Sequence, residues 1–234
     1  PTPAPTPAPT PAPTPAPTPA PTPEPTPEPG PTNCSDYDNT GNTKYCTMDS
    51  GGLEREFFLY IPDNLLGSTD TSPLVMNFHG GDGYAQYEME YTGFRELSET
   101  ENFIAVYPQA LTDPQNGDAT WMHKAPTTHD DIYFISAIID TLSVQYNIDL
   151  SRVYACGYSN GGEFAYDLAC RLNTEIAAIG AVARTMYIET FNNCSPAHPT
   201  GILSILGTSD NISNYNGVTF GGVQVLMVLL VTEL

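Results

Sequence analysis

The sequence predicts an α/β fold, in which helices cover both faces of a mostly parallel β-sheet. Short runs rich in β-branched and aromatic residues recur along the chain. Segments with helical periodicity separate several of these runs, and glycine-rich or polar tips follow three of them. Because strands and helices alternate, consecutive strands are expected to lie parallel in one sheet.

Six runs have the composition of strands, and three segments have apolar residues at helical spacing. The predicted strands are 55–61, 74–78, 103–107, 152–156, 178–182 and 202–206. The predicted helices are 92–101, 130–146 and 163–172. The second helix repeats apolar residues from Ile132 to Leu142, as a helix packed on a sheet would.

Three tips are expected at one edge of the sheet, because sites in such folds form beyond the carboxyl ends of the strands. The segment 79–83 (HGGDG) follows strand 74–78. The segment 157–162 (GYSNGG) follows strand 152–156, and 207–210 (GTSD) follows strand 202–206. The sequence therefore predicts a functional site where these tips meet.

The tip around Ser159 has the spacing of a nucleophile elbow. Gly157-Tyr158-Ser159-Asn160-Gly161 fits the pattern G-x-S-x-G between a predicted strand and a predicted helix. Glycines let the backbone make the tight turn that lifts the serine hydroxyl into the open. We expect Ser159 to be a catalytic nucleophile; the alternative is an ordinary strand-to-helix turn with a serine N-cap.

The other two tips supply the remaining candidates for acyl transfer. The backbone N–H of Gly81 and that of Asn160 are expected to form an oxyanion hole, which stabilises a tetrahedral intermediate. The alternative is a glycine turn with a structural His79. Asp210 is the expected acid, which would orient a histidine; the alternative is an Asx turn at the end of the strand.

The first 32 residues cannot pack a core. Proline occupies every odd position from Pro1 to Pro31, interleaved mainly with Thr and Ala. Such a tract forms an extended polyproline II spacer. We therefore expect a linker at 1–32 and one catalytic domain at 33–234, and we expect the protein to continue upstream of the linker.

Composition and charge exclude several partners. Seven Lys and Arg against 27 Asp and Glu give a formal net charge of −20. No basic stripe is present to hold a phosphate backbone, so nucleic acid is not expected as a partner. The apolar run 221–234 (GGVQVLMVLLVTEL) is too short to span a membrane. Neither a metal ion nor an organic cofactor is expected.

The five cysteines allow two disulfides and one thiol. Cys34 and Cys46 bracket a short polar loop that a disulfide would restrain, and Cys170 and Cys194 are the natural second pair. Cys156 lies in an apolar run and is expected to act as a small buried hydrophobic residue. The strong acidity together with a Pro/Thr spacer favours a secreted, extracellular protein; the alternative is that the charge only solvates the surface.

The chain also resembles a known group of enzymes. The blocks NFHGGDGYAQYEMEYTGFRELSETENFIAVYPQA, DDIYFISAIIDTLSVQYNIDLSRVYACGYSNGGEFAYDLAC and CSPAHPTGILSILGTSDNISNY, with Trp121 between the first two, are similar to feruloyl esterases, acetylxylan esterases and polyhydroxybutyrate depolymerases, which are α/β-hydrolases. The resemblance covers about 51–222. It implies that Ser159 is the nucleophile, Asp210 the triad acid and the HGG turn part of the oxyanion hole.

Two positions depart from that group. Leu206-Gly207-Thr208 stands where the group usually has His-Gly-Thr, and no histidine follows Asp210, where the catalytic histidine of the group lies. His198 is expected at the opposite edge of the sheet, whereas His123 and His129 are on the correct edge. We therefore expect a C-terminally incomplete domain that lacks its last strand and helix and has weak or no activity.

The expected function is hydrolysis of feruloyl or acetyl esters on plant cell-wall polysaccharide such as xylan. A linker of this kind connects a catalytic domain to a carbohydrate-binding or scaffold module, which we expect upstream and which would raise the local concentration of the domain on solid polymer. Two alternatives stay open: a polyester depolymerase of the polyhydroxybutyrate type, and a non-catalytic domain that binds a polymer.

Overall fold

The structure is a computed structural model that describes residues 32–114, 117–121, 131–213 and 215, together with the backbone of 219–220 and 223–224. Residues 1–31 of the predicted linker, and both His123 and His129, lie outside the described residues.

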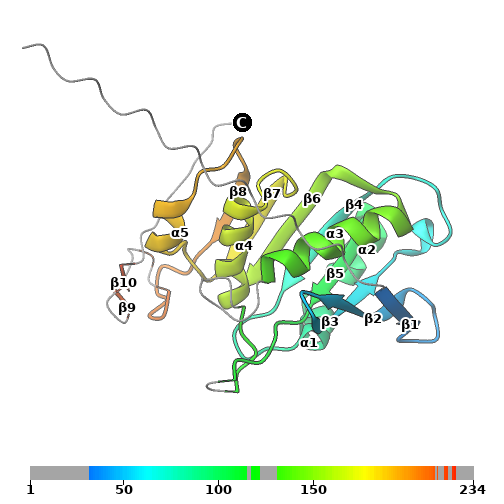
Figure 1. The fold of residues 1–234 in the computed structure, drawn as a ribbon, viewed down its shortest axis with the longest axis horizontal. Coiled ribbons are helices and arrows are strands. Elements are labelled where there is room, and N and C mark those ends of the chain that lie inside the picture. The colour runs from blue at the N-terminus through cyan, green and yellow to red at the C-terminus, as the bar shows by residue number, and fades with distance from the viewer. Residues whose placement is uncertain are drawn as a thin grey trace, which may run out of the picture.

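One mixed sheet holds most of the described strands. They are β1 (Thr32–Asp36), β2 (Thr43–Ser50), β3 (Leu53–Tyr60), β4 (Ser72–Phe78), β5 (Ile104–Pro108), β6 (Ile148–Tyr158), β7 (Ala178–Val182) and β8 (Gly201–Ile205). Their spatial order is β1-β2-β3-β5-β4-β6-β7-β8 (Figure 1). The pairs from β5 to β8 are parallel, whereas β1, β2, β3 and β5 pair antiparallel. The predicted α/β class is confirmed.

Helices cover both faces of this sheet. They are α1 (Ala85–Tyr91), α2 (Phe94–Glu101), α3 (Asp131–Tyr146), α4 (Asn160–Arg171) and α5 (Ile188–Asn193). A 3₁₀ turn, η1, spans Asp63–Leu65, and β9 (Thr219–Phe220) pairs antiparallel with β10 (Val223–Gln224). Helices α3 and α4 share one apolar cluster with the sheet, and α1 and α2 share a second cluster with its other face.

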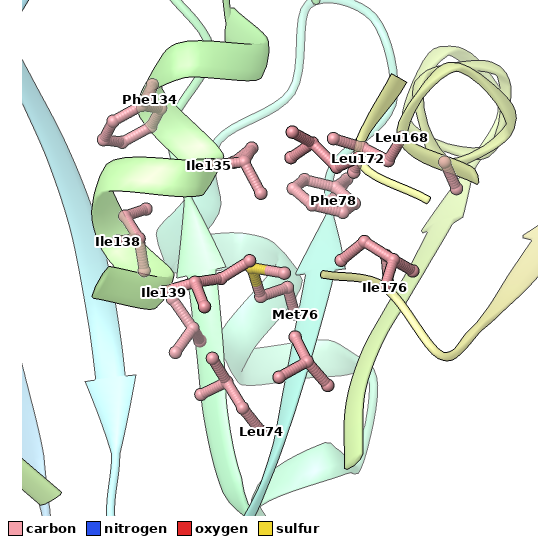
Figure 2. Packing of buried hydrophobic residues seen from close by; sticks show 14 of the residues in the cluster. Leu74, Met76, Phe78, Phe134, Ile135, Ile138, Ile139, Leu168, Leu172 and Ile176 are labelled. Atoms are coloured by element: carbon pink, nitrogen blue, oxygen red, sulfur yellow. The ribbon is translucent and has the colours of Figure 1, made fainter. Parts of the chain in front are cut away.

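The larger cluster is built from the alternation of β4 and the apolar side of α3. Figure 2 shows Ile135 and Ile139 of α3 on the same side of the sheet as Met76 and Phe78 of β4. Both strand residues are fully buried. Burial of side chains of this size contributes about 1.5–3 kcal/mol each, so this layer holds α3 and α4 firmly against the central strands.

The N-terminal segment differs from the prediction. The residues between Cys34 and Cys46 were expected to form a polar loop, but β1 and β2 pair across them, and Cys34 lies directly opposite Cys46. Strand β1 is polar and mostly exposed, so its sequence carries no apolar alternation. The helices α1 and α5 were also not predicted, because each is short, with seven and six residues.

The cysteines are arranged as follows. The structure joins Cys34 to Cys46 and Cys170 to Cys194 by disulfides. The thiol of Cys156 lies in β6, where its Sγ is 3.4 Å from the carbonyl oxygen of Met76. Burial raises the pKa of Cys156 to about 12. A thiol with that pKa is not a reactive nucleophile at neutral pH, in keeping with a packing role.

The parallel register brings the ends of four strands together. Phe78 at the end of β4 lies opposite Gly157 in β6, Tyr158 lies opposite Val182 in β7, and Val182 lies opposite Ile205 in β8. The segments that follow β4, β6 and β8 therefore leave the sheet at the same edge. Within the described residues β8 is the edge strand, and its Leu203 and Ile205 are exposed.

A buried ion pair ties β3 to the start of α3. The guanidinium of Arg55 donates to the carboxylate of Asp131 over 2.6 Å, and the side chains of both residues are almost completely excluded from water. The same guanidinium lies 4.0 Å from the centre of the Phe134 ring. Burial lowers the pKa of Arg55, whereas the Asp131 carboxylate raises it, so Asp131 offsets the cost of burying the guanidinium charge.

We predict that Asp131→Asn destabilises the fold by about 3–5 kcal/mol, because it leaves the charge of Arg55 buried without its partner. Urea unfolding followed by circular dichroism would measure this loss. The double variant Arg55→Met/Asp131→Leu should recover most of it. Asp149→Asn is the matched control, since it breaks the exposed 2.7 Å pair with Arg152 and should change little. Equal effects of Asp131→Asn and Asp149→Asn would contradict the prediction.

Candidate active site

Ser159 lies in a strained turn between β6 and α4. Its φ of 52° and ψ of −117° place a non-glycine residue in a sparsely populated region, which costs on the order of 1–3 kcal/mol. The turn is held on both sides: the Ser159 N–H donates to the carbonyl of Val182 over 2.9 Å, and the Ser159 carbonyl accepts from the Glu163 N–H over 3.0 Å. The strand-turn-helix context predicted for the elbow is present.

Two glycines make this turn sterically possible. A Cβ on Gly157 would lie 2.4 Å from the carbonyl carbon of Gly161. A Cβ on Gly161 would lie 2.3 Å from the carbonyl oxygen of Phe78 and 2.6 Å from that of His79. These distances are far below van der Waals contact, so only glycine lets α4 begin this close to β6 and to the end of β4.

The HGG turn lies beside the elbow. A Cβ added to Gly80 would be 3.5 Å from the Cβ of Ser159, and one added to Gly81 would be 3.7 Å from the Cβ of Asn160. The structure therefore brings three predicted site residues, Ser159, Gly81 and Asn160, to one place. Asn160 is the first residue of α4, where backbone N–H groups lack partners within the helix.

Trp121 connects the elbow to the HGG turn. Its backbone N–H donates to Oδ1 of Asn160 over 2.8 Å, and its indole N–H donates to the carbonyl of His79 over 2.9 Å. Its ring is stacked on Phe164 of α4, with centroids 4.7 Å apart. No motif in the sequence assigns Trp121 a role. Its only sequence signal is that it is the single tryptophan of the chain.

His79 is a structural residue of the turn. Its side chain is buried, its Nδ1 is 2.6 Å from the carbonyl oxygen of Gly80, and its Nε2 accepts from the Ala110 N–H over 3.1 Å. This pattern requires the proton on Nδ1. Burial lowers the pKa of His79, so the ring is neutral at pH 7. The environment of His79 is therefore that of a structural residue, which was the alternative interpretation of this turn.

Gln109, which was not among the predicted site residues, also supports the HGG turn. Its side-chain oxygen accepts from the Ala85 N–H over 2.8 Å, and its amide nitrogen is 3.1 Å from Nε2 of His79. The residue directly follows β5, so it reaches the turn from a neighbouring strand. No local motif marks such a residue, because its partners are distant in sequence.

Asp210 follows β8, two strands from Ser159 in the sheet. Its Oδ1 accepts from the N–H groups of Ser213 over 2.9 Å and of Ile212 over 2.8 Å. These hydrogen bonds lower the pKa of Asp210. The Asx turn that was the alternative to a catalytic role for Asp210 is thus present. Its hydrogen bonds also favour the charged form of the Asp210 carboxylate.

Arg184 is a charged residue beside the elbow that no sequence pattern indicated. Arg184, which follows β7, donates to Oε2 of Glu163 from Nη2 over 3.0 Å, and it also donates to the hydroxyl of Tyr187. Glu163 is buried in the first turn of α4. The charge of Arg184 also contributes to the lowered pKa of Asp210. Arg184 therefore links the start of α4 electrostatically to the candidate acid.

The described histidines are poorly placed to serve as a base. Both ring nitrogens of His79 face protein partners inside the turn. His198 precedes β8, whereas Asp210 follows it, so they lie at opposite edges of the sheet. The His198 backbone N–H donates to Oδ1 of Asn173 there. The other two histidines, His123 and His129, lie outside the described residues.

Within the part of the chain that the structure describes, no cluster of three or more His, Cys, Asp or Glu side chains is arranged to hold a metal ion. None of the helices in the same part combines the length and the apolar character needed to cross a membrane.

The fold is similar to that of solved esterase and hydrolase structures. A crystal structure of a thermostable esterase aligns with a TM-score of 0.56 at 18% identity, covering 74% of this chain and 48% of the other. An S-formylglutathione hydrolase from Agrobacterium tumefaciens aligns with a TM-score of 0.53 at 16% identity, covering 64% and 61%. The predicted α/β-hydrolase fold is confirmed.

Relatives found by sequence are named for a narrower class of esterase than the solved structures are. A bifunctional acetylxylan esterase/xylanase of Neocallimastix patriciarum is 32% identical over 167 residues, which is 71% of this chain and 23% of that protein. Feruloyl esterase B of Piromyces equi is 28% identical over 165 residues, or 70% and 30%. The chain thus spans less than a third of the length of either relative. No family model matches the chain. The predicted resemblance to acetylxylan and feruloyl esterases is confirmed.

We predict that Gly161→Ala destabilises the protein by about 1–3 kcal/mol, because the added methyl group must push α4 away from the end of β4. Urea unfolding would measure the loss. Gly81→Ala is the matched control for stability, since its Cβ would meet nothing closer than 3.7 Å. Similar stability of the two variants would contradict the steric argument.

We further predict that stability falls as the pH drops below about 6.5, the ordinary pKa of histidine. Because the folded-state pKa of His79 is lowered, the unfolded chain binds the proton more readily, and protonation favours unfolding. Urea unfolding at pH 7.5 and 5.5 would test this. His79→Gln, which does not titrate in this range, should lose less stability between the two pH values; an identical loss in both proteins would count against the argument.

Proposed function

We propose that residues 33–234 form the esterase domain of a secreted serine hydrolase that cleaves acetyl or feruloyl esters on plant cell-wall polysaccharide. The observation that carries this proposal is the strained turn at Ser159, packed against Gly80 and Gly81 of the HGG turn and beside Asn160 at the start of α4. The names of the relatives from Neocallimastix patriciarum and Piromyces equi support the class of ester.

The proposed reaction is acyl transfer through a covalent intermediate. The hydroxyl oxygen of Ser159 attacks the ester carbonyl carbon, and the resulting oxyanion accepts hydrogen bonds from the backbone N–H groups of Gly81 and Asn160. Collapse of this intermediate breaks the bond between the carbonyl carbon and the sugar oxygen. The sugar leaves as the alcohol with the proton that Ser159 lost, and the acyl group stays bonded to Ser159. Water then attacks the acyl-enzyme and releases the acid. These steps use protein groups and water, and we propose no cofactor.

The role of Asp210 depends on a base. In a complete triad the carboxylate would orient a histidine and stabilise its charged form. The sequence contains four histidines, and none follows Asp210. His79 is held inside its turn and His198 lies at the far edge, so His123 and His129 are the candidates. We propose that Ser159 in this chain turns over esters weakly, aided by the oxyanion donors.

The proposed surroundings of the domain follow from the Pro/Thr tract. A linker at 1–32 would connect the domain to a carbohydrate-binding or scaffold module and hold it near solid polymer. The two disulfides support an oxidising, extracellular location for the protein.

A fluorophosphonate probe tests the nucleophile. We expect slow labelling of the full chain, loss of labelling in Ser159→Ala, and unchanged labelling in Ser143→Ala, which removes a half-buried serine hydroxyl on α3 that donates to the carbonyl of Asp140. Circular dichroism would verify that each variant is folded. Absent labelling of the folded full chain would sink the proposed function and favour a domain that binds polymer without cleaving it.

The same preparation can identify the base. We expect turnover of p-nitrophenyl acetate to be slow and to change by less than about threefold in His123→Ala and in His129→Ala, because an unaided serine does not depend on either. A loss of about 10²-fold or more in one of them would instead identify it as a general base.

A further inference from the structure

Three tyrosines line the outer side of α1, directly after the HGG turn. Tyr84 precedes the helix, and Tyr87 and Tyr91 follow at intervals of three and four residues, which place side chains on one helical face. Their exposed fractions are 56%, 55% and 81%. The opposite side of α1 buries Ala85 and Met89 against the sheet. The helix is therefore anchored by its inner side and presents the rings to solvent.

The three rings form a contiguous surface, which we call the tyrosine stripe. The ring centres of Tyr84 and Tyr87 are 5.7 Å apart, and those of Tyr87 and Tyr91 are 6.2 Å apart. A fully buried aromatic side chain removes about 150–250 Å² from water. Neighbouring exposed rings of this kind mark a binding surface, because the free energy falls when a ligand covers them and removes them from water.

A groove of about 300 Å³ lies beside the stripe. Its walls include the aromatic residues Tyr45, Phe58, Tyr84 and Tyr87 and the polar residues Glu56 and Gln109. A second hollow of about 230 Å³ shares Glu56, Tyr84 and Gln109 with the first and extends to Asp82, the neighbour of Gly81. The two hollows together lead from the tyrosine stripe to the HGG turn.

The charges around these hollows select against anions. Glu54, Glu56 and Asp82 line the second hollow. Arg55 lines it too, but its guanidinium is paired with Asp131. With a net charge of −20 over the chain, the surface repels polyanions. Carboxylate and amide groups nevertheless offer hydrogen bonds to neutral hydroxyl groups.

We propose that the tyrosine stripe and its groove bind a neutral polysaccharide chain and guide it toward Ser159. Tyrosine rings pack against the apolar faces of sugar rings, while the carboxylate of Glu56 accepts hydrogen bonds from hydroxyl groups at the rim of the groove. The assignment of a polysaccharide rests on the proposed function. The binding surface itself does not include Ser159. Polysaccharide binding and the reactivity of Ser159 can therefore be tested independently.

Affinity electrophoresis in gels that contain soluble arabinoxylan tests the proposal. The full chain with Ser159→Ala keeps the ester groups of the polymer intact and should be retarded. Adding Tyr87→Ala and Tyr91→Ala should raise the apparent Kd about tenfold, because two stacking contacts are lost. Tyr87→Phe with Tyr91→Phe should retain most of the binding, since the ring faces remain. Carboxymethyl cellulose, an anionic polymer, should retard the protein less than arabinoxylan does.

Phe191→Ala is the matched control, because it removes an exposed ring from α5, which packs beside α4 on the other side of the sheet. It should leave the retardation unchanged. The proposal is overturned if arabinoxylan does not retard the protein, if Phe191→Ala weakens binding as much as the tyrosine variants do, or if sedimentation shows that the stripe instead joins two copies of the chain. Fluorophosphonate labelling of Ser159 without polymer retardation would overturn this inference and leave the proposed function standing.

Discussion

The candidate site depends on how closely the start of α4 approaches the end of β4. Gly161 lies against the carbonyl groups of Phe78 and His79, where any Cβ would overlap backbone atoms that cannot move independently. This contact places the turn at Ser159 beside the HGG turn. It also explains why strain at Ser159 persists, since parallel strands on either side of β6 hold the flanking backbone.

Polar contacts from distant segments then hold the parts of the site in register. Trp121 bonds to Asn160 and to His79, while Gln109 reaches His79 and the start of α1. A neutral His79 is suited to this role, because one nitrogen donates and the other accepts. Because both ring nitrogens are engaged in this way, His79 is unsuited to act as a base. It supports the HGG turn and takes no part in proton transfer.

Much of the architecture followed from local patterns. The strand at 178–182 was predicted with its observed bounds, and helix α3 began within one residue of its prediction, because both segments are rich in apolar residues. Strand β1 and helix α1 were missed for the opposite reason. One is polar and pairs through a neighbouring strand, and the other is short and amphipathic with tyrosines on its exposed side.

The class of fold and the spacing around Ser159 follow from local patterns, because glycine requirements and apolar runs act over a few residues. The support of the turn by distant groups such as Gln109, Trp121 and Arg184 is visible only in the folded chain. The same is true of the groove that Tyr84 and Tyr87 line. Such neighbours are created when strands order themselves in a sheet, and strand order depends on packing across the whole domain rather than on any local pattern.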